Sequence, residues 1–240
     1  MGRGDRIMSD PAKIALEEFK NVFKSVEVKA DPETEAQEKR RAKESWDKRL
    51  HGSGIEKRFI HSTFREIEAQ GVPNDIRKNY AKAKEYAENF PKYFDKGVGV
   101  MFMGKVGRLK TTMAVAIAQS VMRTGYSAYF ISMAELLDRM ISMSKNHDRT
   151  ELYHFENMIS DTSLLILDDL GMEYPSDWVL NKVDAIVTKR YNKMLPLIIT
   201  TNLTPDQIDS RYMQRIYDRL KSTSFVLIET GESLREKPEE

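Results

Sequence analysis

The 240-residue sequence contains no cysteine and only four histidines. This excludes a disulfide scaffold and a thiolate metal site, and it makes a histidine-only metal site a poor hypothesis. Net charge is also close to zero, with 38 Lys and Arg against 37 Asp and Glu, so any nucleic-acid contact depends on local basic patches. No apolar run approaches the roughly 18 residues that span a bilayer, and the N-terminus lacks the apolar core of a signal peptide. We therefore expect a cytoplasmic protein with no membrane partner.

The stretch 98–112 has the outline of a phosphate-binding loop between a strand and a helix. Such a loop needs backbone N–H groups around the phosphate oxygens, a lysine for the β- and γ-phosphates and a hydroxyl group for Mg²⁺. Lys110 and Thr111 follow Gly104 at the required spacing. Thr111 is accordingly a predicted Mg²⁺ ligand. The residues expected to bind ATP or ADP are Gly104, Val106, Gly107, Lys110, Thr111 and Thr112.

One position departs from the pattern G-x-x-x-x-G-K-[ST], because Leu109 stands where the second glycine belongs. That position needs a backbone conformation that a Cβ atom resists, although Gly107 supplies part of the freedom. The strain costs about 1–3 kcal/mol, which weakens nucleotide binding about tenfold or more. Taken alone, the stretch 98–112 also fits an ordinary strand–turn–helix. Because of Leu109, the sequence leaves open whether ATP is hydrolysed.

An apolar run at 163–167 ends in two acids, Asp168 and Asp169. A run without alternation is typical of a central parallel strand that is buried on both faces and opens at its C-terminal end on a ligand crevice. We expect Asp168 to hold Mg²⁺ through water, and Asp169 to orient and deprotonate the attacking water. Acids also occur as solvated residues at the ends of buried strands. The two aspartates therefore indicate a nucleotide site only together with the phosphate loop upstream.

Four further polar residues complete the candidate site. Asn202 follows another apolar run and is expected to position the hydrolytic water, although a turn or helix cap explains a lone Asn better. Arg215 and Arg219 are four residues apart and share one helical face, where cations are usually solvated. The sharper hypothesis is an arginine finger that reaches the γ-phosphate of a neighbouring subunit. Arg235 lies beyond the last strand and is placed to fold back over the nucleotide.

Alternating apolar runs and helical periodicities predict a three-layer α/β domain, because strands separated by helices pair in parallel through right-handed crossovers. The strands are expected at 98–103, 127–132, 163–168, 197–201 and 225–229. The helices are expected at 74–90, 111–123, 133–143, 178–194 and 205–220.

Two helices are expected before this domain. The first covers 11–28 and places Leu16, Phe19 and Phe23 on one apolar face. The second, at 33–50, is almost entirely charged, which favours a solvated linker helix over a nucleic-acid-binding arm. A Gly-Ser-Gly break follows. The expected division is an N-terminal helical region and linker at 1–52 and an ATPase domain at 53–240.

The order of these motifs resembles the AAA+ ATPases of the DnaC type, the bacterial and phage replicative helicase loaders. The resemblance covers about 53–235 and rests on SGIEKRFIHSTF, KAKEYAENF, LLILDDLG, QRIYDRL and TGESLR. It implies an AAA+ P-loop fold with sheet order 5-1-4-3-2, ATP as ligand and self-assembly. It also makes Asn202 sensor 1, Arg219 the arginine finger and Arg235 sensor 2. The family usually has Asp-Glu where this chain has two aspartates.

The resemblance further implies a loader that binds a hexameric replicative DNA helicase and helps place it on single-stranded DNA, with ATP binding or hydrolysis as the assembly switch. The residues expected to hold the helicase are Leu16, Phe19 and Phe23. One alternative is a transposition helper ATPase of the IstB type, which shares this core and acts on duplex DNA. Another is a nucleotide-dead AAA+ adaptor, because of Leu109.

Single-stranded DNA is expected to contact the region after the second strand. Arg139, Lys145 and Arg149 are candidates for phosphate contacts, and Tyr153 or Phe155 is a candidate for base stacking. The alternative is a polar surface loop at 144–150 followed by two core aromatic residues.

Overall fold

The computed structural model describes residues 32–145, 149–212 and 214–234. The helix expected at 11–28 and Arg235 lie outside these residues. The charged linker helix is confirmed as α2 (Pro32–Gly52), and its described side chains are exposed except for half-buried Trp46 and buried Leu50. The contacts within the chain divide it into two units, Met1–Trp46 and Asp47–Glu240, and the division falls within this helix. The domain boundary expected between residues 52 and 53 stays a prediction.

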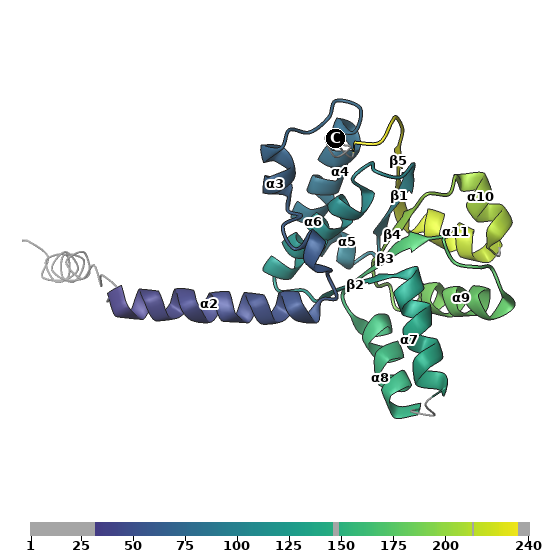
Figure 1. The fold of residues 1–240 in the computed structure, drawn as a ribbon, viewed down its shortest axis with the longest axis horizontal. Coiled ribbons are helices and arrows are strands. Elements are labelled where there is room, and N and C mark those ends of the chain that lie inside the picture. The colour runs from purple at the N-terminus through teal and green to yellow at the C-terminus, as the bar shows by residue number, and fades with distance from the viewer. Residues whose placement is uncertain (1–31, 146–148, 213, 235–240) are drawn as a thin grey trace, which may run out of the picture. The chain divides into compact units, whose positions relative to one another are not determined.

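A parallel five-stranded sheet forms the centre of the second unit (Figure 1). The strand order is β2-β3-β4-β1-β5, which confirms the predicted order 5-1-4-3-2. The strands are β1 (Gly99–Gly104), β2 (Ala128–Ser132), β3 (Leu164–Leu170), β4 (Leu197–Thr201) and β5 (Ser224–Glu229). Because all strands run in parallel, the C-terminal ends of β1, β3 and β4 lie side by side at one edge of the sheet.

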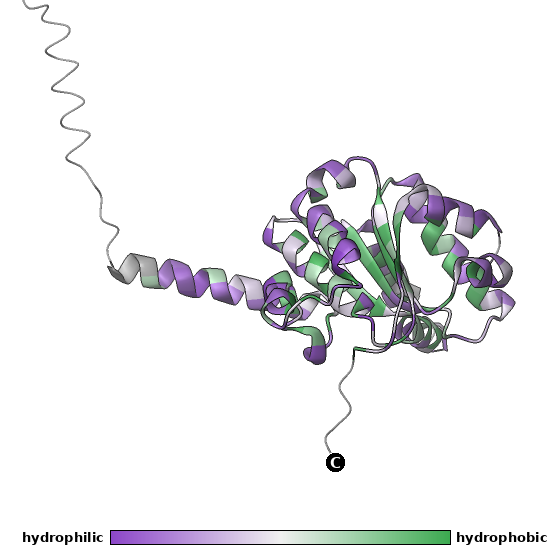
Figure 2. Cartoon of the chain, turned by 90° about the horizontal axis from the view of Figure 1, so that it is seen from above, coloured by the Kyte–Doolittle hydropathy of each residue, from purple (hydrophilic) through white to green (hydrophobic). Residues whose placement is uncertain are grey.

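Helices cover both faces of the sheet, which confirms the three-layer α/β architecture (Figures 1 and 2). Before β1 lie η1 (Lys57–Phe59), α3 (Phe64–Ala69), α4 (Arg77–Glu88) and α5 (Phe90–Phe94). After it follow α6 (Lys110–Arg123), α7 (Met133–Lys145), α8 (Arg149–Asp161), α9 (Asp177–Asn192), α10 (Pro205–Arg211) and α11 (Gln214–Ser222). The strands, whose hydrophobic residues colour the ribbon green in Figure 2, are therefore enclosed between the two helical layers.

One face of the sheet packs against α7, α8, α9 and α11. Alternate strand residues such as Met101, Ile131 and Leu167 belong to this core cluster. On the other face α6 contacts four of the strands and packs against α4. Strand residues are thus buried on both faces, as the uninterrupted apolar runs indicated.

Two details of the predicted helices are wrong. The helix expected at 205–220 is two helices, because Tyr212 has an extended backbone and its buried hydroxyl group donates to the Glu173 carboxylate. The sequence analysis also missed α8, which turns Phe155 into the core so that only 6% of it is exposed. Phe155 is therefore not a base-stacking residue, whereas Tyr153 is 63% exposed.

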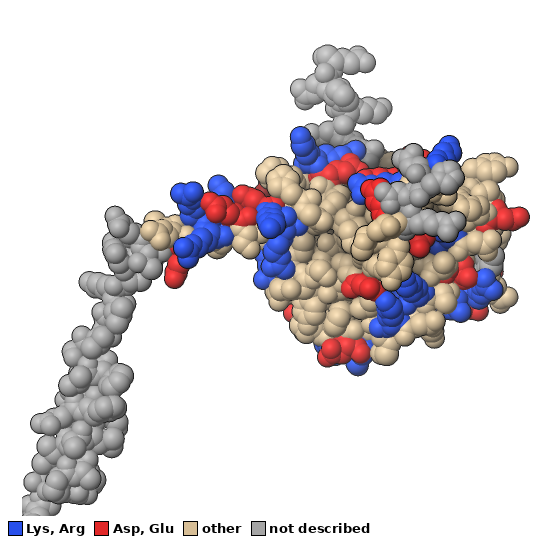
Figure 3. All heavy atoms as spheres, turned by 90° about the horizontal axis from the view of Figure 1, so that it is seen from below, with Lys and Arg blue, Asp and Glu red and all other residues tan. Residues whose placement is uncertain are grey.

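On the face seen in Figure 3, basic and acidic side chains of the second unit are interspersed. Within the described ranges, no helix has the length and apolar character that crossing a membrane requires.

Candidate nucleotide-binding site

The phosphate loop runs from the end of β1 to the start of α6 and contains three residues with positive φ. Gly104 has φ 136° and Gly107 has φ 80°. A Cβ atom at Gly104 would lie 2.1 Å from the carbonyl oxygen of Glu229, so no other residue fits there. Leu109 has φ 56° and ψ 15°. Leu109 thus adopts the left-handed conformation expected of the missing glycine, at a strain of about 1–3 kcal/mol.

Lys110 is 6% exposed, and its ammonium group lies over the loop. Its Nζ atom donates to the carbonyl oxygens of Gly104 (2.8 Å) and Lys105 (2.7 Å) and to Asn202 Oδ1 (2.8 Å). Asn202 follows β4, the neighbour of β1 in the sheet. The structure therefore joins the predicted phosphate-binding lysine to the predicted sensor residue.

Asp168, at the end of β3, lies across from Thr111 of α6. Its Oδ1 atom accepts hydrogen bonds from Thr111 Oγ1 at 2.9 Å and from Thr200 Oγ1 at 2.6 Å. Burial raises the pKa of the Asp168 carboxyl to about 6, and the neighbouring Asp169 adds to the rise, whereas the two hydroxyl groups oppose it. Thr200 was not predicted, because its role depends on the pairing of β3 with β4.

Oxygen ligands of this kind suit Mg²⁺, which usually binds one or two carboxylates and keeps sites for water and phosphate. The described residues hold no group of three or more metal-binding side chains, so a dedicated all-protein metal cage is absent from this part of the chain. Asp168 and Thr111 thus fit an Mg²⁺ ion that arrives with a nucleotide.

Asp169 has φ 55°, also in the left-handed region, and its side chain is exposed. Its backbone N–H donates to Thr200 Oγ1 at 3.0 Å, and the register between β3 and β4 shifts at this point. Asp adopts positive φ more readily than most residues. The positive φ is therefore a physical reason for Asp at this position, where the family that the sequence resembles usually has Glu.

These residues line one cavity of about 610 Å³, a volume typical of small-molecule sites. The predicted residues on its wall are Val106, Gly107, Lys110, Thr111, Thr112, Asp168, Asp169 and Asn202. Gly104 joins them through its hydrogen bond to Lys110. The wall also contains Glu56, Arg58, Phe59, Arg108, Ser132 and Met172, which the sequence did not single out for the site.

Arg215 and Arg219 do not line this cavity. Both bind Asp184 of α9, Arg215 at 2.7 Å and Arg219 at 3.4 Å, and Arg219 also donates to Thr188 Oγ1 at 2.5 Å. An arginine finger that acts on a neighbouring subunit stays a prediction.

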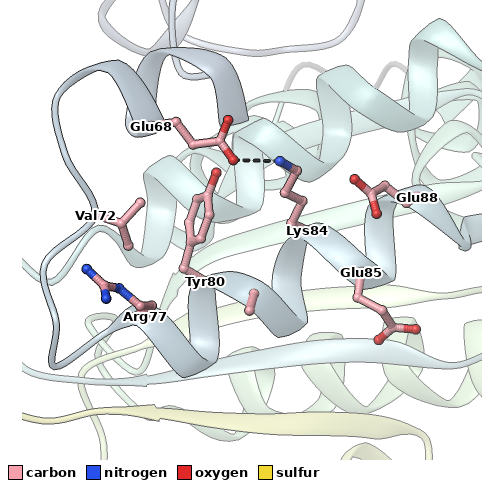
Figure 4. A pocket seen from close by; sticks show the side chains of 8 residues that line it. Glu68, Val72, Arg77, Tyr80, Lys84, Glu85 and Glu88 are labelled. Atoms are coloured by element: carbon pink, nitrogen blue, oxygen red, sulfur yellow. Dashed lines mark hydrogen bonds and ion pairs between the residues drawn. The ribbon is translucent and has the colours of Figure 1, made fainter.

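A second hollow of about 670 Å³ lies between α3 and α4 (Figure 4). Three glutamates line it, Glu68, Glu85 and Glu88, and Lys84 is paired with Glu68 at 2.5 Å. Arg77 also lines the hollow, so its charge is mixed, and its lining has neither the glycines of a phosphate loop nor a Ser or Thr hydroxyl group.

The family described as IstB-like ATP binding protein matches residues 82–240. The replicative helicase loader DnaC of Escherichia coli K12 is 25% identical over 155 residues, which are 65% of this chain and 60% of that protein. DnaC of Buchnera aphidicola subsp. Baizongia pistaciae is 26% identical over 191 residues, 78% of this chain and 75% of that protein. The replicative helicase loader DnaI of Bacillus subtilis is 29% identical over 118 residues, 49% of this chain and 37% of that protein.

Two solved structures show the same fold. A crystal structure of the DnaC helicase loader has a TM-score of 0.65 at 24% identity, over 73% of this chain and all of that one. The replication initiator DnaA bound to AMPPCP and single-stranded DNA has a TM-score of 0.60 at 20% identity, over 71% of this chain and 50% of that one. Because the family model matches residues 82–240, more than half of the sequence, this chain belongs to the family of IstB-like ATP-binding proteins, and it is similar to the DnaC-type replicative helicase loaders.

Proposed function

We propose that this protein is an ATP-binding helicase loader that holds a hexameric replicative DNA helicase and helps place it on single-stranded DNA. The observation that carries the proposal is the convergence on one cavity of Lys110 and Thr111 from the start of α6 with Asp168 of β3 and Asn202 after β4. Similarity to proteins named replicative helicase loaders supports the choice of partner. The chain spans 60% of the Escherichia coli relative.

In the proposed site the backbone N–H groups of the phosphate loop surround the phosphates, and Lys110 contacts the β- and γ-phosphate oxygens. Thr111 and Asp168 hold Mg²⁺, which neutralises charge on the same oxygens when bound. Asp169 orients the attacking water and accepts a proton from it, and Asn202 holds that water in position. Arg219 of a neighbouring subunit and Arg235 stabilise the charge that develops on the γ-phosphate.

The remaining elements of the proposal concern assembly. Residues 1–52 form the helicase-binding region, through the apolar face of Leu16, Phe19 and Phe23, and residues 53–240 form the ATPase domain. ATP binding or hydrolysis is the switch that assembles or releases the complex. Single-stranded DNA contacts Lys145 and Arg149 in the assembled form.

The test is capture of purified hexameric replicative helicases on the tagged full-length chain, with ATP and without nucleotide. We expect ATP-dependent capture that is lost when both Phe19 and Phe23 are replaced by Asp, while the folded core and ATP binding remain. Capture by that double variant would contradict the assignment of the N-terminal face. Absence of capture by the wild-type chain with every helicase would contradict the loader itself.

The family description favours a second candidate, a transposition helper of the IstB type. Such a protein would retain duplex DNA and a transposase in the same experiment and would leave the helicase in solution. A nucleotide-dead adaptor would capture its partner equally with and without ATP, and titration with labelled ATP would detect no binding.

A further inference from the structure

Arg108 lies in the middle of the phosphate loop, yet only 1% of it is exposed. An arginine in a glycine-containing surface loop is ordinarily solvated. Its guanidinium instead pairs with the Asp75 carboxylate, just before α4, and its Nη1 atom donates to the carbonyl oxygen of Glu232 at 2.7 Å. The Nε atom has no hydrogen-bond partner in the described part of the chain. Burying a cation gives little net stability even where acids such as Asp75 and nearby Glu229 interact with it, so fold stability alone does not explain Arg108.

The segment that Arg108 holds is the turn after β5. Gly231 has φ 102°, and a Cβ atom there would lie 2.8 Å from Asp75 Oδ2 and 3.3 Å from Arg108 Cζ. The backbone N–H of Leu234 donates to the carbonyl oxygen of Gly107 at 2.9 Å. The segment 231–234 therefore packs directly on the phosphate loop, and Leu234 lines the nucleotide cavity.

Leu109 follows Arg108 directly and is the strained residue of the loop, with φ 56°. On its other side, Lys110 begins α6 and is fixed by its three Nζ hydrogen bonds, and the carbonyl oxygen of Leu109 accepts from the N–H of Met113 at 2.8 Å. A side chain in the left-handed region persists only where its surroundings over-determine the backbone. On the N-terminal side of Leu109, the neighbouring residue is Arg108, whose guanidinium is anchored to Asp75 and Glu232.

We propose that Arg108 is a positioning residue: anchored to Asp75 and Glu232, it holds Leu109 in the left-handed conformation that a phosphate loop needs and takes over the role of the missing glycine. This proposal rests on the nucleotide site proposed above. In the usual pattern a glycine reaches this conformation because it has no Cβ atom. Here a buried arginine side chain holds a leucine in the same conformation. The loop then stays competent for phosphate binding in spite of Leu109.

The test is a double-mutant cycle with Arg108→Met, Leu109→Gly and the combined variant. Arg108→Met lets Leu109 leave the left-handed region, so only about a tenth of the molecules keep a competent loop and the Kd for ATP rises about tenfold. In the combined variant the glycine adopts positive φ without strain, and the Kd returns to within about threefold of the wild type. Leu109→Gly alone changes the Kd less than about threefold, because Arg108 already holds the loop. This expectation replaces the weakening of about tenfold inferred from the sequence, which applies to a loop that Arg108 does not hold.

A second readout needs no nucleotide. Leu109→Gly removes strain only where Arg108 maintains it, so it raises Tm by about 2–4 °C more in the wild-type background than in the Arg108→Met background. The lost leucine contacts and the added backbone entropy are the same in both backgrounds and cancel in this comparison. Asp75→Asn should shift the Kd in the same direction and be rescued by the same glycine. Lys193→Met, which removes an exposed cation paired with Asp161, is the matched control and should change neither readout.

The outcomes separate the two proposals. Equal Tm shifts from Leu109→Gly in both backgrounds overturn the role of Arg108, whatever ATP does. A combined variant that binds ATP as weakly as Arg108→Met also overturns it. If no variant, nor the wild type, binds ATP but the Tm shifts differ as expected, the positioning of Leu109 stands and the proposed nucleotide site fails.

Discussion

Replacing Asp168 with Asn isolates the charge of the buried carboxylate at the end of β3. Asn keeps the size of the side chain and an Oδ1 atom that accepts the hydrogen bonds from Thr111 and Thr200, at 2.9 and 2.6 Å in the wild type. It removes the negative charge that burial disfavours, the reason that the Asp168 pKa is raised to about 6. We therefore expect a variant that folds more stably but no longer binds nucleotide in an Mg²⁺-dependent manner.

The magnitude follows from the pKa. Against an ordinary value of 3.8, the rise is about two units, and 1.36 kcal/mol per unit gives at most about 3 kcal/mol. Since the folded pKa lies above the unfolded one, the wild type has its full stability below about pH 4 and loses this increment as pH rises through about 6. The advantage of Asp168→Asn is thus absent below about pH 4 and complete above about pH 6, where it raises Tm by up to about 10 °C.

The assay is thermal unfolding at pH 4, 5.5 and 7.5, with EDTA and without nucleotide. Asp169→Asn is the matched control, because the Asp169 side chain is exposed and its removal should shift Tm much less. A lower Tm of Asp168→Asn at pH 7.5, or an equal gain at pH 4, would refute the argument from desolvation. ATP binding with and without Mg²⁺ is the functional arm, and an unchanged Mg²⁺ dependence would remove Asp168 from the metal site.

Three further predictions concern other parts of the domain. Lys110→Ala should abolish ATP binding measured by titration, because it removes the cation that faces the β- and γ-phosphates, and equal affinity would contradict the site. Arg190→Met should lower the free energy of unfolding by about 3 kcal/mol or more, because buried Arg190 donates hydrogen bonds to four carbonyl oxygens. The control Lys193→Met should change the free energy of unfolding by less than about 0.5 kcal/mol. Lys145→Glu with Arg149→Glu should weaken single-stranded DNA binding by the ATP-bound assembly and leave helicase capture intact. Unchanged DNA affinity at low salt would place the DNA path elsewhere.

The candidate-site residues whose positions in the fold can be predicted from the sequence are those at the ends of apolar runs. Gly104, Asp168 and Asn202 each follow such a run, and a local pattern is enough to identify a buried strand and its polar end. Parallel pairing then places the ends of β1, β3 and β4 at one edge, which the hydrogen bond between Lys110 and Asn202 bears out. No long-range information beyond the alternation of strands and helices was needed.

Residues whose roles depend on packing between distant segments could not be predicted. Thr200 lies inside β4, and only the register of β4 against β3 directs its hydroxyl group to Asp168. Arg108 becomes buried because Asp75 and the segment around Gly231 meet at the loop.

The helix α8, in contrast, could have been predicted from the sequence, since Leu152, Phe155 and Ile159 recur at helical spacing.

The surroundings of Asp168 also bear on why an acid stands at this position. Its carboxylate is held by neutral hydroxyl groups of Thr111 and Thr200, and burial raises its pKa to about 6. A neighbouring Lys or Arg would have lowered the pKa and stabilised the fold. Asn would make the same hydrogen bonds without the cost of desolvation. In the proposed nucleotide site, a bound Mg²⁺ would offset this cost by pairing with the buried charge, which is a physical reason for an acid rather than Asn at this position.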